Sequence, residues 1–380
     1  MLNHLRICHI STVHAGFDAR VWERECAVIA KKGYDVHLFV PESDTNVYKD
    51  VVVHSLNKYQ SRYARFRYAK EAIKKVLAIE PVIIHFHDPE LIPVMLSVKR
   101  EMPGIKIVFD CHEDSISHIA LKEYIPSFMR PLIEKTLTYY FKRAAKQFDA
   151  IVTADDGVHN IFKEWGANPI TYFNYPPLEI YCEEPKSDYM QREFDVIYPG
   201  STPRYHLRLM FDIAKELKRR GWNTKWLIIA KLQFKDADAW VKSNLKELCL
   251  EENFNFKPLV PLTELPRYLR TARIGIIPLP DSPKFYRNIP SKLFDYFLAG
   301  LPVVLSDLPP SRPFIEDRNI AFAVSANDAC AYADAIINLL DNPTLLSEMG
   351  KRARKIATEH YTLEKESNKL IDLYEDLISN

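Results

Sequence analysis

Short runs of apolar, mostly β-branched residues alternate with longer helical patterns along almost the whole chain of 380 residues. In the first half, such runs lie at 5–11, 35–40, 51–56, 82–87, 106–111, 150–154 and 170–174. In the second half, they lie at 195–200, 226–230, 255–260, 274–279, 302–306 and 321–324. Strands separated by helices form β-α-β units and a mostly parallel sheet. The sequence therefore predicts an α/β protein.

A proline-rich and acidic segment divides these strands into two series. Residues 175–189 contain three prolines and four acidic residues, a composition typical of a linker. A chain of 380 residues also has the length of two domains. We therefore predict two doubly wound, Rossmann-like domains facing a cleft, at 1–175 and 194–360, with a linker at 176–193. The spacing of apolar residues predicts an amphipathic helix over 361–380.

Glycine spacing and net charge disfavour three classes of protein. The 10 glycines form neither G-x-G-x-x-G nor G-x-x-x-x-G-K, which disfavours a dinucleotide-dependent dehydrogenase and a P-loop ATPase. The net charge of +1 disfavours a generally basic nucleic-acid-binding protein, so we expect no nucleic-acid partner.

The cysteines favour a reducing compartment. The six cysteines are scattered and form no C-x-x-C motif, as expected for reduced thiols in the cytoplasm. The first residues run directly into a strand-like segment, so we expect no signal peptide. No uninterrupted apolar stretch is long enough to span a membrane.

A basic segment at 58–75 has a net charge of +6 with four aromatic residues interleaved. Such a helix can lie on an anionic membrane surface or hold an acidic acceptor. The segment 122–146 has a weaker form of the pattern, with a net charge of +4. An ordinary solvated helix face explains both segments equally well. We expect a cytoplasmic protein that can lie at the inner face of the membrane.

A predicted helix near residue 290 has the features of a phosphate site. Pro290 suits the first turn of this helix, and Gly300 suits its end. The helix would begin near the carboxyl ends of the strands, where its backbone N–H groups attract phosphate. Ser291 and Lys292 add a hydroxyl and a cation, and Asp295 could accept hydrogen bonds from a ribose. Spacing alone slightly favours a capped helix in which Lys292 and Asp295 simply pair.

Histidines and acids end two predicted strands of the first half. His85, His87 and Asp88 end one strand, and Asp110, His112 and Glu113 end the next. These residues could line a sugar-binding cleft, which the pattern favours. They could instead ligate Zn²⁺ or Mn²⁺, or cap the strand ends and the following helices.

The turn after the first strand is a weaker signal. Gly16 permits close approach of the backbone to a ligand. His14, Asp18 and Arg20 follow the same turn and could contact a substrate. Spacing alone favours a helix cap at Asp18 and surface positions for the others.

The first half contains Ile7-Cys-His-Ile-Ser-Thr-Val-His, His85-Phe-His-Asp-Pro-Glu-Leu and Phe109-Asp-Cys-His-Glu-Asp. Later in the chain come Asn174-Tyr-Pro-Pro and Pro290-Ser-Lys-Leu-Phe-Asp-Tyr-Phe-Leu-Ala-Gly-Leu-Pro-Val-Val. In this order, the motifs resemble those of retaining GT-B glycosyltransferases of the large family that includes sucrose synthase and bacterial cell-surface glycosyltransferases (glycosyltransferase family 4-like). The resemblance covers nearly the whole chain.

The resemblance implies transfer of a sugar from a nucleotide-diphosphate sugar, UDP rather than GDP, to a glycan or lipid-linked acceptor, with retention of configuration. The nucleotide-sugar is a substrate, and the resemblance implies neither a cofactor nor a metal. It also implies that the helix over 361–380 packs back onto the first domain. The expected pathway is the synthesis of surface polysaccharide or glycoconjugate.

The strand-end and turn residues, taken together with the resemblance, give candidates for particular roles. Three residues are candidates for catalysis: His112, Asp88 and Glu113. Nine are candidates for donor binding: Gly16, Arg204, Lys231, Lys257, Leu259, Asn288, Ser291, Lys292 and Asp295. Four are candidates for acceptor binding: His14, Asp18, Arg20 and His87.

The chain departs from the family pattern at three positions. Arg287 stands where the family has the first of two spaced glutamates, and Asp295 stands where it has the second. Ser201 stands where an arginine usually follows the glycine. Three alternatives stay open: a GT-B sugar-nucleotide epimerase, a metal-dependent hydrolase using His85, His87, Asp110 and His112, and a carbohydrate-binding scaffold without turnover.

Overall fold

The computed structural model describes residues 5–13, 18–41, 47–57, 65–114, 116, 125–183 and 189–379. The chain forms two compact units. Unit 1 comprises Met1–Asn174 with Leu363–Asn380, and unit 2 comprises Tyr175–Thr362. The segment that we expected to be a linker, 176–193, is therefore part of unit 2. Its described residues include Tyr181 and Tyr189, which are both buried.

Unit 1 is built on one sheet of eight strands, in the order β3-β4-β2-β1-β5-β6-β7-β8. All neighbouring strands are parallel except β3 and β4. The strands are β1 (Arg6–Ile10), β2 (Asp35–Pro41), β3 (Val47–Tyr48), β4 (Val51–Leu56), β5 (Ile83–Phe86), β6 (Lys106–Cys111), β7 (Ala150–Thr153) and β8 (Pro169–Thr171). Seven of these match the predicted strands. The two-residue β3 is too short to produce a pattern.

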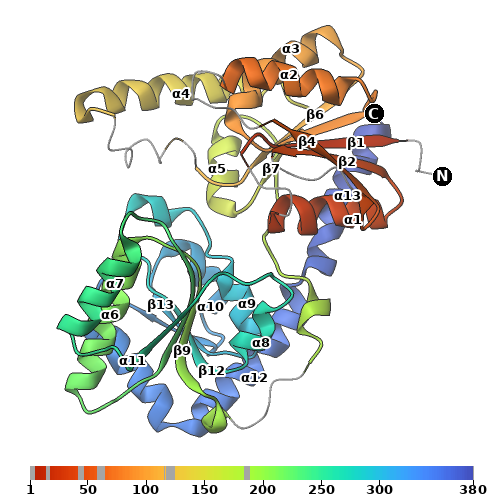
Figure 1. Ribbon diagram of the computed structural model, residues 1–380. Helices are drawn as coiled ribbons and strands as arrows, with labels where there is room; N and C mark the ends of the chain where they lie inside the picture. The colour runs from red at the N-terminus through yellow and green to blue at the C-terminus, as the bar shows by residue number, and fades with distance from the viewer. Residues whose placement is uncertain are drawn as a thin grey trace. The chain divides into compact units, whose positions relative to one another are not determined.

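Helices cover both faces of this sheet (Figure 1). On one face, the core contains side chains from α2 (Arg65–Leu77), α3 (Ile92–Glu101), α4 (Arg130–Ala145) and α5 (Asp156–Glu164). On the other, it contains side chains from a π-helix, η1 (Ala19–Cys26), from α1 (Ala27–Lys31) and from α13 (Leu363–Ser379). Leu363, Leu370 and Tyr374 are the buried apolar residues of α13, so this amphipathic helix completes the core of unit 1.

Unit 2 has a parallel sheet of six strands, in the order β11-β10-β9-β12-β13-β14. The strands are β9 (Phe194–Thr202), β10 (Trp226–Leu232), β11 (Phe254–Lys257), β12 (Ala272–Ile277), β13 (Val303–Ser306) and β14 (Ala321–Val324). The core on one face contains side chains from α6 (Arg204–Arg219), α7 (Ala237–Glu247) and α11 (Ala329–Asp341). Helix α12 (Pro343–His360) contacts α9 (Lys292–Leu298).

Helix α9 is the helix predicted near residue 290, although it begins at Lys292 rather than in the turn at Pro290. It ends where Gly300 adopts a φ of +69°, and the Leu301 N–H donates to the Tyr296 carbonyl at 2.8 Å. This is the glycine-dependent helix ending that the sequence suggested. The Tyr296 hydroxyl donates toward the carbonyl oxygens of Ile197 and Ile276 at 3.0 and 3.1 Å, which anchors α9 to β9 and β12.

Gly275 of β12 leaves room for the Tyr296 ring, and we expect Gly275→Ala to destabilise the protein. An added Cβ would lie 2.6 Å from the ring, which the two hydrogen bonds hold in place. Overpacking of this kind costs about 1–3 kcal/mol of unfolding free energy, measurable by urea denaturation. The control is Gly104→Ala, where nothing lies within 4 Å of the added Cβ. A Gly275→Ala protein as stable as Gly104→Ala would contradict the prediction.

Candidate functional site

In unit 1, four histidines and an aspartate gather at the carboxyl ends of three adjacent strands. His9 is in β1, His85 is in β5 with His87 just beyond it, and Asp110 is in β6 with His112 just beyond it. Because carboxyl ends of parallel strands share one edge of the sheet, the predicted strand-end residues do come together. His9, His85, His87 and Asp110 are all buried, whereas the His112 side chain is 16% exposed.

Arg20 of η1 is the counter-ion of Asp110. Its Nε donates to Asp110 Oδ2 at 2.9 Å, and its Nη2 donates to Oδ1 at 2.8 Å. Its Nη1 donates to the Tyr172 carbonyl at 2.9 Å and to Asn174 Oδ1 at 3.0 Å. Burial alone would raise the pKa of Asp110, but Arg20, followed by His112 and His87, holds it well below its usual value. Arg20 was predicted to contact the acceptor, yet it is buried and fully engaged with the protein.

The protonation of Asp110 determines the tautomers of two histidines. An ionised carboxylate only accepts hydrogen bonds, so each ring nitrogen that contacts it must carry the hydrogen. His87 Nδ1 lies 3.2 Å from Asp110 Oδ2, and His112 Nε2 lies 2.9 Å from the same oxygen. Both His112 Nε2 and His87 Nδ1 therefore donate to Asp110, and these two nitrogens lie 3.1 Å apart.

A buried chain of hydrogen-bonding side chains extends from His87 through His9 and Tyr374 to His85. Burial lowers the pKa values of His9 and His85 well below the usual value, so both rings are neutral. His87 Nε2 and His9 Nδ1 lie 3.1 Å apart and share a hydrogen bond. His9 Nε2 lies 3.1 Å from the Tyr374 hydroxyl, which in turn lies 2.5 Å from His85 Nδ1. These contacts connect His9, Tyr374 and His85 to Asp110 through His87.

Glu25, also in η1, is a buried acid that the sequence did not single out. Its Oε1 lies 3.1 Å from Arg20 Nε, and its Oε2 lies 3.6 Å from His9 Nδ1. Burial, reinforced by the charge of Asp110, raises the pKa of Glu25 well above its usual value. Burial beside Asp110 therefore favours the protonated form of Glu25.

This cluster has the residue types of a metal site. One ligand atom from each of Glu25, His87, Asp110 and His112 lies within 4.8 Å of the others, and the same holds for His9, Glu25 and His85. The hydrolase hypothesis combined His85 with His87, Asp110 and His112, but His85 belongs to the second group, and Glu25 takes its place beside the other three. Arg20 donates to both oxygens of Asp110, so a guanidinium group already supplies positive charge beside this carboxylate.

The other predicted residues of unit 1 have different surroundings. Asp88 is buried and accepts from Ser11 Oγ at 2.8 Å and from the Thr12 N–H at 2.6 Å, so it shapes the turn after β1. Asp18 caps η1 by accepting from the N–H groups of Arg20 and Val21. His87 is buried in the chain described above, and Glu113 is exposed. His14 and Gly16 lie outside the described residues.

In unit 2, Lys292 lies beside the carboxyl end of β9. Its Nζ is 4.9 Å from the centre of the Tyr198 ring. A Cβ built on Gly200 would lie 3.6 Å from the same nitrogen, so Gly200 and Lys292 are direct neighbours. Gly200 has a φ of +132°, which a residue with a side chain rarely adopts. The first turn of α9 thus places a cation next to accessible backbone at the ligand-binding edge of the sheet.

Asp295 is buried one turn further along α9. Its Oδ1 accepts from the Tyr181 hydroxyl at 2.8 Å. Tyr181 is itself held by Arg354, which donates to the Tyr181 carbonyl at 2.9 Å and to the Leu298 carbonyl. The segment that precedes β9 therefore positions the acid predicted to bind ribose. A carboxylate accepts several hydrogen bonds, so the contact with Tyr181 is compatible with a ribose ligand.

The remaining donor candidates differ in exposure. Arg204 is exposed and its guanidinium lies 4.9 Å from the Phe234 ring centre and 5.4 Å from that of Trp240. Lys231, Leu259 and Ser291 are exposed, whereas Lys257 and Asn288 are half-buried. Arg287, at the position of the family glutamate, is exposed.

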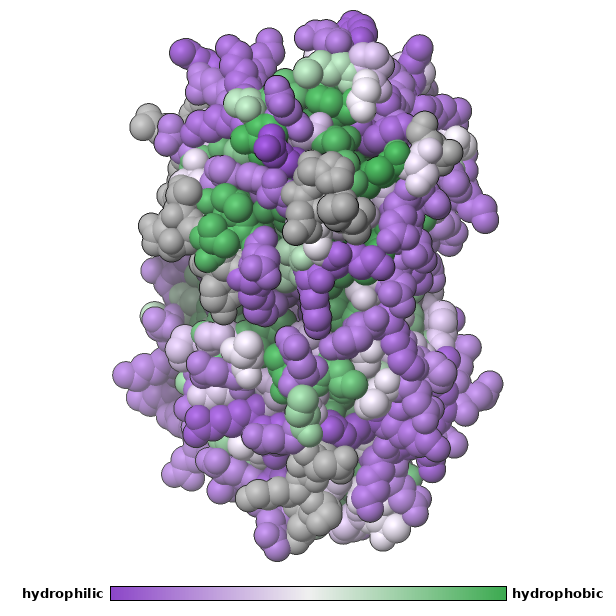
Figure 2. Space-filling view, turned by 90° about the vertical axis from the view of Figure 1, so that its right-hand side faces the viewer, coloured by the Kyte–Doolittle hydropathy of each residue, from purple (hydrophilic) through white to green (hydrophobic). Residues whose placement is uncertain are grey.

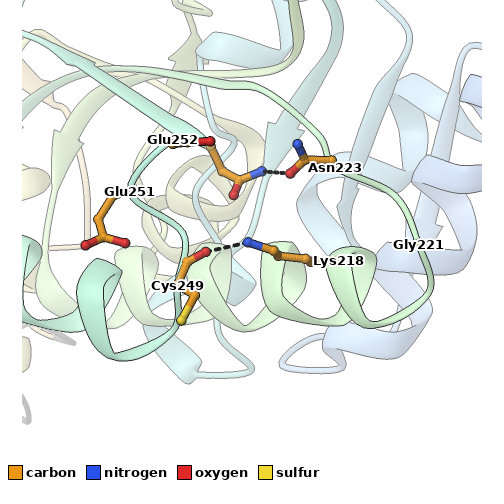
Figure 3. Close-up of a pocket in the computed structure, with 7 residues that line it drawn as sticks. Lys218, Gly221, Asn223, Cys249, Glu251 and Glu252 are labelled. Carbon is orange, nitrogen blue, oxygen red and sulfur yellow. Dashed lines mark hydrogen bonds between the residues drawn. The ribbon is translucent and has the colours of Figure 1, made fainter.

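A pocket of about 510 Å³ lies at the opposite edge of this sheet. It is lined by residues from the end of α6 and from the turns that precede β10 and β11: Lys218, Gly221, Asn223, Cys249, Glu251, Glu252 and Asn253. Figure 3 shows Lys218 directed at the Cys249 carbonyl, to which it donates at 2.5 Å. The pocket is at the amino ends of the strands and is separate from Gly200 and Lys292.

Two family models together match most of the chain. The model described as Glycosyltransferase Family 4 matches residues 18–173, and the one described as Glycosyl transferases group 1 matches residues 193–342. The chain belongs to the family 4-like glycosyltransferases.

Solved structures identify the fold of this glycosyltransferase as GT-B. Sucrose-phosphate synthase from Thermosynechococcus elongatus has a TM-score of 0.78 and 15% identity, covering 99% of both chains. Anabaena HepE in complex with UDP and glucose has a TM-score of 0.73 and 12% identity, covering 98% of this chain and 100% of the other. These similarities show two Rossmann-like domains, as the sequence predicted.

A curated relative is similar over a shorter stretch. The UDP-Gal:alpha-D-GlcNAc-diphosphoundecaprenol alpha-1,3-galactosyltransferase of Escherichia coli is 20% identical over 117 residues. The match spans 31% of this chain and 29% of that protein.

Several residues of the candidate site were not predicted from the amino-acid sequence. Glu25 and Tyr374 occur within amphipathic helical patterns, where their roles leave no local trace. His9 had a signal, because a histidine in the middle of an apolar strand needs buried partners. Tyr181 was assigned to a linker because of its proline-rich neighbours.

Proposed function

We propose that this protein transfers a sugar from a UDP-sugar to a hydroxyl group of a glycan or lipid-linked acceptor, with retention of configuration at the transferred carbon. The reaction would serve the synthesis of a surface polysaccharide or glycoconjugate. The observation that carries this proposal is the position of Lys292 beside Gly200 at the carboxyl end of β9. There a diphosphate would meet a cation and an open stretch of backbone.

Two relatives support UDP as the nucleotide. HepE has been solved with UDP and with UDP-glucose, and the Escherichia coli relative is named for UDP-Gal. The base of UDP would lie near Lys257 and Leu259, at the end of β11. The ribose would meet Asp295 on α9.

Charge development explains how this site would accelerate transfer. As the bond to the sugar breaks, the diphosphate becomes more negative and the sugar acquires oxocarbenium character. Lys292 is already held near Tyr198 and Gly200, so it would stabilise the leaving group without reorganising. In unit 1, His112 is the proposed contact of a sugar hydroxyl, and Asp110 orients its ring through Nε2.

Retention would follow from attack of the acceptor hydroxyl on the same face that the diphosphate leaves. The alternative is a covalent intermediate on a carboxylate. Asp88 and Asp110 are poor candidates for that nucleophile, because both are buried and accept hydrogen bonds from the protein. An anomer-resolved NMR spectrum of the product tests retention of configuration, and an inverted product would contradict it.

We also propose that transfer needs no metal ion and takes place in the cytoplasm. Lys292 supplies positive charge in unit 2, and Arg20 holds Asp110 in unit 1. The six cysteines are free thiols, as expected in a reducing compartment.

A thermal-shift panel of UDP, GDP, ADP and CMP, with and without EDTA, tests the nucleotide and the metal together. UDP at about 100 times its Kd should add about 2.7 kcal/mol of stability and raise Tm by about 5–10 °C. The shift should survive EDTA and disappear in Asp295→Ala. If no nucleotide raised Tm but EDTA lowered it, the result would overturn the proposal and favour the metal-dependent hydrolase.

A further inference from the structure

An unusual group of apolar side chains is exposed at the start of helix α4 in unit 1. Phe128 is 81% exposed, Leu132 67% and Tyr139 61%. Phe128 belongs to the short 3-10 helix Ser127–Met129, which leads directly into α4. Residues separated by three, four or seven positions share one face of a helix, so the three side chains form a single stripe.

The first ten residues of α4 contribute little to the core of unit 1. Its buried residues, Phe141, Ala144 and Ala145, all lie in the last two turns. Figure 1 shows the helix extending beyond the edge of the sheet of unit 1. Packing among the described residues of unit 1 therefore does not bury the apolar stripe.

Cations flank the stripe. Lys135, Lys142, Arg143 and Lys146 are exposed, and Arg143 donates to the Tyr139 hydroxyl at 2.8 Å. Glu134 is the single acid between residues 125 and 146. This arrangement combines an apolar strip with positive charge on both sides, the pattern of a helix that lies in a membrane interface.

Helix α2 is where the sequence placed the membrane contact, and over 67–77, where the structure describes its side chains, it lacks the apolar part of this pattern. In its described portion, Tyr68 is buried. The exposed positions are occupied by Arg67, Lys70, Glu71, Lys74 and Lys75. Residues 58–64 lie outside the described residues. The described face of α2 is thus charged only, and it supplies a matched control.

We propose that residues 127–146 dock unit 1 on the surface of an anionic lipid bilayer. Phe128 and Leu132 enter the acyl region below the headgroups, and Lys135, Lys142 and Arg143 contact lipid phosphates. An aliphatic Leu132 beside Phe128 suits acyl chains better than nucleic-acid bases, which stack on aromatic rings. Among the described helices, none has the length and apolar composition needed to cross a bilayer. The face in Figure 2, by contrast, is mostly hydrophilic with small scattered apolar groups.

The test is co-sedimentation of the full chain with vesicles of phosphatidylcholine alone or with 30% phosphatidylglycerol, a mixture chosen at roughly physiological charge. Wild type should bind the anionic vesicles and bind the neutral ones only weakly. Its binding to the anionic vesicles should decrease as the salt concentration rises. Lys135→Glu with Lys142→Glu should weaken binding at least about tenfold, because each replacement removes a cation that anionic lipid attracts and adds an acid that it repels. Lys70→Glu with Lys74→Glu, on α2, should change it much less.

The apolar contribution is tested separately. Phe128→Ser with Leu132→Ser should weaken binding to the same vesicles, whereas Val47→Ser, at an equally exposed apolar position, should not. Phe128→Trp should show fluorescence that brominated acyl chains quench, beyond the quenching of wild type. Circular dichroism and Tm verify that each variant is folded.

Three outcomes would overturn the proposal. These are equal loss of binding from the α2 and α4 charge reversals, no added quenching in Phe128→Trp, or a wild-type dimer in the absence of vesicles that Phe128→Ser with Leu132→Ser dissociates. The last result would identify the stripe as an interface between copies of the chain. Since the assays use neither donor nor acceptor, their failure would leave the proposed transferase activity unaffected.

Discussion

Replacing Lys292 by alanine is expected to lower kcat/KM for sugar transfer by about 10²–10³-fold, the usual effect of removing one preorganised group that stabilises developing charge. Lys292 is the cation adjacent to Gly200 and Tyr198 at the carboxyl end of β9. Its loss should fall mainly on kcat, because the diphosphate charge grows in the transition state. The measurement is steady-state transfer from a UDP-sugar, together with the UDP-induced rise in Tm.

Two variants control for this effect. Lys292→Arg keeps the charge and should retain more activity than the alanine variant. Lys218→Ala removes a lysine from the pocket at the opposite edge of the sheet and should leave both kcat and the UDP shift unchanged. Equal activity losses in Lys218→Ala and Lys292→Ala would contradict the placement of the donor site.

Replacing Arg20 by alanine is expected to destabilise unit 1 by about 3–5 kcal/mol, the cost of leaving one partner of a buried ion pair without the other. Asp110 is fully buried and depends on Arg20 for two of its hydrogen bonds. Without the guanidinium, Asp110 would take up a proton, and the hydrogen bonds of His87 and His112 would weaken. Urea unfolding at neutral pH measures the loss.

The double variant Arg20→Met with Asp110→Leu separates the charge effect from a packing effect. Removing both charges leaves no unpaired ion, so it should be more stable than Arg20→Ala. Arg220→Ala breaks a half-buried ion pair with Glu216 and a second pair with Asp334, and it should cost much less stability than Arg20→Ala. If Arg20→Ala were no less stable than Arg220→Ala, Asp110 would not depend on Arg20.

The strands were the most predictable part of this protein. Both faces of each parallel sheet are covered by helices, so central strands such as β6 and β10 appear as short continuous apolar runs. Helix α9 was recognisable from local chemistry, although it begins at Lys292 rather than at Pro290, because the turn before it does not continue the helical hydrogen bonds. Such local patterns depend only on residues that are close in the sequence, so the strands and this helix can be predicted without knowledge of the tertiary structure.

The candidate site was predictable only in part. Strand ends placed His87, Asp110 and His112 at one edge of the sheet, since parallel strands share that edge. Their roles were not predictable. His87 was expected at the acceptor, but it is buried in a chain of hydrogen bonds. Asp88 was expected in catalysis, but it organises the turn at Ser11 and Thr12.

The sequence by itself determined the α/β class, the order of the strands along the chain and the family, because these depend on periodicity and on contiguous motifs. The tertiary structure decided which polar groups meet. Arg20 pairs with Asp110 across 90 residues, and His85 meets Tyr374 across 289. Buried polar groups must find partners wherever the fold places them, because an unpaired one costs free energy. No local pattern encodes that choice, since it arises only when distant segments pack together.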